Sequence, residues 1–144
     1  MIIDCHGHYT TEPKDLHRFR KDQTEAVKNG TAMPPRSGLK MTDDEIRETL
    51  EQNQIRLQRE RGTDVTIFSP RASGMGHHIG DESVSLEWTA ICNDLIHRCV
   101  TLFPKNFIGV CQLPQSPGVP IDGSITERIR FIDHILDKLI RYCL

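Results

Sequence analysis

Three short apolar segments alternate along this chain with long segments whose apolar residues recur at helical spacing. The apolar segments are the start MIIDCHGHYT, the run from about Asp64 to Ser69, and NFIGVCQLP. The last of these is apolar on both faces apart from Gln112, which is typical of a strand in a parallel sheet covered on both sides. The alternation therefore predicts an α/β fold with right-handed connections between parallel strands.

Two segments between the strands have clear helical patterns. In MTDDEIRETLEQNQIRLQRERG, Thr42 and Glu45 form a capping-box pattern and Gly62 supplies a stop. The apolar stripe of that segment consists of Ile46, Leu50 and Leu57. In SVSLEWTAICNDLIHRCVTLFP, a second stripe at helical spacing ends before Pro104. Its members are Trp88, Ile91, Cys92, Leu95, Cys99 and Leu102.

The other two segments complete the alternation. Residues from about Glu12 to Leu39 are polar and contain several prolines and glycines, so we expect a long, partly helical loop there. The final segment, SITERIRFIDHILDKLIRYCL, begins with a second capping-box pattern at Ser124 and Glu127. It therefore predicts a third helix after the third strand.

Two architectures begin with this order of elements, a doubly wound open sheet and a (β/α)8 barrel. A nucleotide-binding open sheet would favour a glycine-rich turn after the first strand, but DCHGHYTTEP contains neither GxGxxG nor GxxxxGK[ST]. The barrel therefore fits better. Because a barrel has eight strands and typically about 250 residues, the 144 residues here predict the first three β/α units of an incomplete (β/α)8 TIM-type barrel.

The first strand ends in the motif HGH. Regular alternation would place Asp4, His6 and His8 on one face of the strand, with Cys5 and Gly7 on the other. Neutral imidazole is a good zinc ligand, and a catalytic zinc site normally has three protein ligands and one open position. The pair predicts half of a metal site, although an isolated HxH also occurs by chance without a metal.

The carboxyl ends of barrel strands carry the chemistry of barrel enzymes. In this chain those ends read HGH, SPR and QLP. We therefore expect one rim to collect His6, His8, Ser69, Arg71 and Gln112.

Charge and hydropathy limit the classes of partner. The 18 basic and 20 acidic residues are interspersed along the chain, which argues against a nucleic-acid-binding arm or a polybasic membrane anchor. No apolar signal region follows Met1, and no stretch approaches the roughly 20 apolar residues of a membrane span. We expect a cytoplasmic protein whose partner is a small molecule rather than nucleic acid or a membrane.

Four stretches together resemble one enzyme family. MIIDCHGHYTTEPK, FSPRASGMGHHIGD, WTAICNDLIHR and FPKNFIGVCQLPQSPGVPID are similar to the amino-terminal part of the 4-oxalomesaconate hydratase family, within the metal-dependent amidohydrolase superfamily. The resemblance runs from Met1 to about Ile125. We therefore expect residues 1–125 to be the amino-terminal portion of an amidohydrolase-like barrel, and residues 126–144 to be a helical tail that departs from the family pattern.

The resemblance implies a set of roles for named residues. His6 and His8 would be ligands of a catalytic divalent metal, usually zinc, which activates water for addition to the carbon–carbon double bond of an unsaturated oxo tricarboxylate in protocatechuate breakdown. Arg71 would bind a carboxylate of that substrate, since its planar fork matches the group bidentately. His77 or His78 would assist with proton transfer or binding. A plain surface ion pair for Arg71 and a structural loop role for the two histidines stay open.

Three alternatives remain at this point. The chain is a metal-dependent hydratase or a related decarboxylase of the same superfamily, with the missing half supplied by another copy or chain, or it is a catalytically silent half-barrel that keeps the metal-binding pair. Later strands of the family supply the remaining ligands, so a truncated or frame-shifted product is one expectation. Three parallel strands also leave sheet edges and an apolar face to be covered, which leads us to expect a homo-oligomer.

Overall fold

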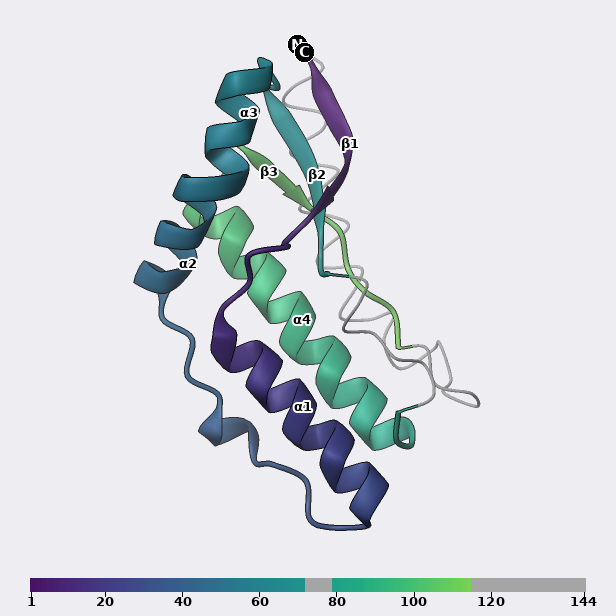
Figure 1. Ribbon diagram of the computed structural model, residues 1–144. Helices are drawn as coiled ribbons and strands as arrows, with labels where there is room; N and C mark the ends of the chain where they lie inside the picture. The colour runs from purple at the N-terminus through teal and green to yellow at the C-terminus, as the bar shows by residue number, and fades with distance from the viewer. Residues whose placement is uncertain (72–78, 115–144) are drawn as a thin grey trace.

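The computed structural model describes residues 1–71 and 79–114. Three parallel strands form one sheet in the order β1-β2-β3, with β1 at Ile3–His8, β2 at Val65–Ser69 and β3 at Phe107–Gly109. The three arrows of Figure 1 point the same way, so their carboxyl ends share one edge of the sheet. The predicted α/β fold with a parallel sheet is confirmed.

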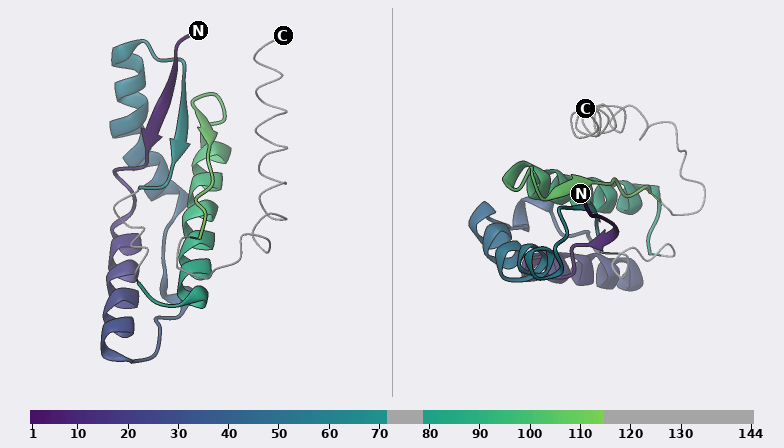
Figure 2. Two further views of the ribbon diagram at one scale, coloured as in Figure 1. Left: turned by 90° about the vertical axis from the view of Figure 1, so that its right-hand side faces the viewer. Right: turned by 90° about the horizontal axis from the view of Figure 1, so that it is seen from above.

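Helices occupy the segments between the strands. They are α1 (Lys14–Asn29), α2 (Asp43–Leu50), α3 (Arg56–Arg61) and α4 (Glu82–Leu102), with a π-helical turn at Glu51–Ile55 between α2 and α3 and a 3₁₀ turn at Arg36–Gly38. Figures 1 and 2 show α1 and the first half of α4 extending beyond the carboxyl ends of the strands. The two helices contact each other there, because the Arg20 guanidinium lies 4.6 Å above the Trp88 ring.

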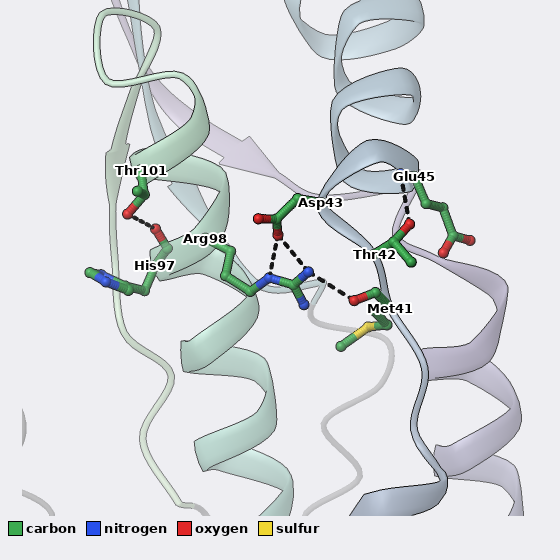
Figure 3. A network of polar contacts seen from close by, with 7 residues as sticks. All are labelled: Met41, Thr42, Asp43, Glu45, His97, Arg98 and Thr101. Atoms are coloured by element: carbon green, nitrogen blue, oxygen red, sulfur yellow. Dashed lines mark hydrogen bonds and ion pairs between the residues drawn. The ribbon is translucent and has the colours of Figure 1, made fainter.

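The capping signals of α2 and α3 act as the sequence predicts. The Thr42 side chain accepts a hydrogen bond from the Glu45 amide, and Gly62 ends α3 in the left-handed conformation at φ 67°. Arg98 of α4 donates to the Asp43 carboxylate at 2.6 and 2.9 Å and to the Met41 carbonyl at 2.8 Å, as Figure 3 shows. This contact ties the start of α2 to α4.

The segment between β1 and α2 is more regular than the expected loop. It contains the 16-residue helix α1, whose inner face buries Leu16, Phe19, Gln23 and Ala26. The Gln23 side chain is fully buried and donates to Glu87 of α4 at 2.9 Å. A search for apolar residues at helical spacing misses this helix, because one position of its buried face is the polar residue Gln23. That residue can be buried only because Glu87 of another helix bonds it.

The core lies between the sheet and the helices. Phe68 of β2 and Phe107 of β3 stack with ring centroids 4.4 Å apart, and the apolar stripes of α2 and α4 cover them. The buried residues of those stripes include Ile46, Leu50, Ile91, Leu95, Ile96 and Cys99. Most of the apolar positions that predicted the two helices therefore also form the core, whereas Leu57 is half-buried and Ile55 of the π-helical turn is buried.

Strand β3 is shorter than the predicted segment NFIGVCQLP. Its ladder continues through one further bond, from the Val110 amide to the Phe68 carbonyl at 2.8 Å. Beyond it, the Asn93 side chain of α4 both donates to the Gln112 carbonyl and accepts from the Gln112 amide, at 3.0 and 2.7 Å. The strand ends early because a helix side chain replaces its neighbouring strand as hydrogen-bond partner. The helix expected from Ser124 onward lies outside the described residues.

Candidate metal centre at the carboxyl end of the first strand

Strand β1 contains one extra residue opposite β2. Asp4 pairs with Thr66 and Gly7 pairs with Phe68, so three steps along β1 match two steps along β2. Because Thr66 and Phe68 share a face of the sheet and neighbouring partners point the same way, Asp4 and Gly7 share that face too. The expectation that Asp4 and His8 lie on one face is therefore wrong, since a bulge interrupts the alternation.

Gly7 allows β1 to approach β2 closely at the bulge. A Cβ atom at this position would lie 2.1 Å from Thr66 Cγ2 and 3.0 Å from the Ile67 carbonyl oxygen. No larger side chain fits without displacing the strand. The glycine between the two histidines thus sets the position of His8 relative to β2.

The side chains of His6 and His8 converge despite the bulge. Their Nε2 atoms lie 3.1 Å apart, and the rings meet edge to face with centroids 4.9 Å apart. His6 is exposed and His8 is half-buried. The Asp4 carboxylate accepts a hydrogen bond from the His6 backbone amide at 3.0 Å, so it stabilises the bulge rather than either imidazole ring.

Two oxygen atoms, from Ser69 at the end of β2 and from Pro70, define which nitrogen of the His8 ring donates. The Ser69 hydroxyl donates to the Gly7 carbonyl at 3.1 Å, so its oxygen accepts from His8 Nδ1 at 2.7 Å. The Pro70 carbonyl, which only accepts, lies 3.1 Å from the same Nδ1. Both contacts place the proton on Nδ1 and leave the lone pair of His8 Nε2 directed at His6.

The two Nε2 atoms fit a shared metal ion. Nitrogens that each lie about 2.0–2.1 Å from one tetrahedral zinc stand about 3.3 Å apart, close to the observed 3.1 Å. In metal sites, a histidine that binds the metal through one ring nitrogen is usually oriented by a hydrogen bond from its second ring nitrogen. Within residues 1–71 and 79–114 there is no group of three or more His, Cys, Asp or Glu side chains that could hold a metal ion.

Glu12, four residues after His8, carries a buried carboxyl group. The Glu12 side chain is 8% exposed, and its Oε1 atom lies 3.5 Å from His17 Nε2. Burial raises the pKa of Glu12 to about 7, and the positive charge of Arg71 opposes this rise. Arg71 itself is exposed. The structure thus gives Arg71 an electrostatic neighbour in Glu12, which the sequence pattern did not indicate.

The structure joins three of the predicted rim residues. His6, His8 and Ser69 are joined by direct contacts, whereas the backbone of Gln112 is bonded to Asn93. His77 and His78 lie outside the described residues.

The sequence analysis did not single out Tyr9, which follows the strand-end motif, or Thr49 and Gln54, which bond the residues directly after that motif. The phenol of Tyr9 lies 2.6 Å from Thr49 Oγ1, and Gln54 bonds both threonines that come next. Sequence patterns did not indicate a role for Thr49 and Gln54, because their hydrogen-bond partners lie about 40 residues away in the sequence.

Comparison with known proteins identifies the family. Residues 3–138 match the amidohydrolase family. The chain belongs to the amidohydrolase family. The amidohydrolase match spans both the HGH strand and the parallel sheet that positions it, which agrees with the resemblance inferred from the sequence.

Two relatives of this amidohydrolase chain carry the same activity in their names. The chain is 53% identical to 2-keto-4-carboxy-3-hexenedioate hydratase of Sphingobium sp. strain SYK-6 over 135 residues, which are 94% of this chain and 39% of that protein. The crystal structure of 4-oxalomesaconate hydratase from Rhodopseudomonas palustris matches with a TM-score of 0.82 and 47% identity, covering 94% of this chain and 40% of that one. The chain thus spans about 40% of the length of these relatives.

Among the described segments of the chain, none of the helices has the length and apolar character needed to cross a membrane.

Proposed function

We propose that this chain is the amino-terminal portion, residues 1–125, of a zinc-dependent hydratase of 4-oxalomesaconate, and that its three β/α units begin a (β/α)8 barrel. The observation that carries the proposal is the convergence of His6 and His8 Nε2 atoms at 3.1 Å in a chain 53% identical to a named hydratase. Residues 126–144 form a helical tail in this proposal.

The residues present would divide the work of the site. His6 and His8 would hold the metal, which when bound supplies Lewis acidity for the addition of water to a double bond. Ser69 and the Pro70 carbonyl would keep the His8 lone pair aimed at the metal. Arg71 would bind a substrate carboxylate, because its guanidinium is exposed beside the sheet edge.

Proton transfer needs a group outside the metal pair. His77 or His78 would assist with proton transfer or with substrate binding. Glu12 would influence Arg71 through its charge. Further ligands would come from chain beyond the described residues, because catalytic zinc usually has three protein ligands.

Zinc binding tests the metal site directly. We expect the 144-residue protein to bind one zinc ion in a competition titration with a chromophoric chelator, and the double variant His6→Ala, His8→Ala to lose that binding. The control is His97→Ala, which removes an exposed histidine of α4. Equal zinc content in parent and His6→Ala, His8→Ala would refute the site.

A second candidate function is a half-barrel that binds metal without turnover. It is supported by the finding that residues 1–71 and 79–114 offer no group of three possible ligands. The two candidates separate in an assay of the zinc-loaded chain with 4-oxalomesaconate. Turnover that disappears with His6→Ala supports the hydratase, and zinc binding without turnover supports the half-barrel. Assembly into a homo-oligomer stays a prediction.

A further inference from the structure

The π-helical turn between α2 and α3 has no role in the sites described so far. It covers Glu51–Ile55 in an otherwise continuous helical stretch from Asp43 to Arg61. Such turns are rare and occur frequently beside functional sites. The side chains that flank this one contact the segment that directly follows His8.

Gln54 bonds two consecutive residues of that segment. Its amide nitrogen donates to Thr10 Oγ1 at 3.2 Å, and its amide oxygen accepts from Thr11 Oγ1 at 2.9 Å. Both halves of one amide are therefore used, which defines the orientation of the side chain. Gln54 and Thr11 are half-buried, so water competes less for the bond between them than at an exposed site.

Thr49 bonds the residue just before these threonines. Its hydroxyl donates to the Ile46 carbonyl at 3.1 Å, so the Tyr9 hydroxyl donates to Thr49 Oγ1 at 2.6 Å. Tyr9 is fully buried, and burial raises the pKa of its phenol, which keeps the donor protonated. The three residues after His8 are thus all attached to one helical stretch.

The π turn explains how Thr49 and Gln54 reach the same segment. Residues five apart in a regular α-helix point in directions about 140° apart, because each residue turns about 100°. A turn with i→i+5 bonds accommodates one extra residue and brings the two side chains toward one side. A regular helix through this region would present only one of them to Tyr9, Thr10 and Thr11.

The attached segment is connected directly to the metal ligand. The Thr10 amide donates to the His8 carbonyl at 2.9 Å, and the Tyr9 amide donates to the Ser69 carbonyl at 3.0 Å. A displacement of Thr10 therefore moves the His8 backbone. His8, Thr10 and Gln54 also line one pocket of about 150 Å³, so the attached segment and the metal ligand border the same space.

We propose that the π turn makes Gln54, together with Thr49, a positioning residue that holds His8 in its metal-binding orientation through Tyr9, Thr10 and Thr11. This inference rests on the proposed metal site at His6 and His8. It adds a function for an irregular helix that contacts no metal ligand itself.

The test replaces Gln54 by methionine, which has a similar volume and removes both hydrogen bonds. We expect zinc affinity to fall about tenfold, the lower end of the loss seen when outer-sphere partners of a metal site are removed. The matched control is Gln52→Met, in the same turn, because Gln52 is exposed and its side chain donates to Glu48. The double variant Thr10→Val, Thr11→Val should show the same loss, and adding Gln54→Met to it should change little further.

Nitrogen NMR of the His8 ring in the metal-free protein gives a second readout. We expect the Nδ1–H signal to shift or broaden in Gln54→Met and to stay in place in Gln52→Met, with thermal unfolding confirming that both variants fold. Parent-like zinc affinity and an unchanged His8 signal in Gln54→Met would overturn the inference. A parent protein that binds no zinc would refute the proposed function, while the His8 signal would still decide the positioning role.

Discussion

Phe68 and Ser69 are neighbours in β2 with opposite roles. Phe68 is fully buried between the strands and the helical layer, where it stacks on Phe107 and touches Tyr9. Ser69 points to the other face and uses its hydroxyl to connect Gly7 with the His8 ring. One face of the strand therefore stabilises the fold by apolar burial, and the end of the other face aims a ligand by hydrogen bonds.

Because the two faces differ in this way, substitutions should change stability and metal binding separately in this chain. Contacts on the helical side depend on volume and close packing. Contacts at the carboxyl ends of the strands depend on the direction of hydrogen bonds and on which ring nitrogen carries a proton. They involve half-buried or exposed residues such as His8 and His6. Substitutions one residue apart should therefore change different measured quantities.

The largest expected effect is that of Phe68→Ala on stability. Removing a fully buried aromatic ring costs about 3–5 kcal/mol of unfolding free energy, because transfer energy is lost and a cavity remains. Urea unfolding followed by circular dichroism measures this loss. A cost below 1 kcal/mol would show that the helical layer is not the main source of stability.

Glu12→Gln should have an intermediate effect, seen in the pH dependence of stability. The pKa of Glu12 in the folded chain is about 7, which lies above its value in the unfolded chain. The contribution of Glu12 to the free energy of unfolding is therefore fully present below about pH 4.5, and it is lost as the pH rises through 7. Between pH 5 and pH 8 the parent should lose about 2 kcal/mol more than Glu12→Gln.

The control for this comparison is Glu60→Gln, since Glu60 is an exposed glutamate paired with Arg56. It should follow the parent across the pH range. His17 and Arg71, the groups that face Glu12, are unchanged in both variants. Parallel pH profiles for the parent and Glu12→Gln would show that the carboxyl group is not held in a buried, protonated state.

The smallest effect belongs to Ser69→Ala and should separate the two faces of β2 most sharply. Zinc affinity should fall about tenfold, which equals about 1.4 kcal/mol, because the His8 ring loses its shorter hydrogen bond. Stability should change much less than in Phe68→Ala. Ser83→Ala, which removes the exposed hydroxyl bonded to Asp81, serves as the control in the zinc titration.

Much of the fold could be predicted because its signals are local. The cap at Thr42, the stop at Gly62 and the stripe of α4 each depend on residues within a few positions of one another. Helix α1 was harder to recognise, because buried Gln23 finds its partner Glu87 in a distant helix. The length of β3 was overestimated because Asn93, a helix residue, bonds the backbone that would extend it.

By itself, the sequence determined the order of the elements, the parallel sheet and the pair of histidines at the end of β1. The tertiary structure decided that the alternation breaks at a bulge, that His8 is protonated on Nδ1, and that a π turn directs Thr49 and Gln54 at the segment after His8. Periodicity and capping act between near neighbours in the chain, whereas the direction of a side chain at a sheet edge depends on hydrogen bonds to residues about 40 to 60 positions away.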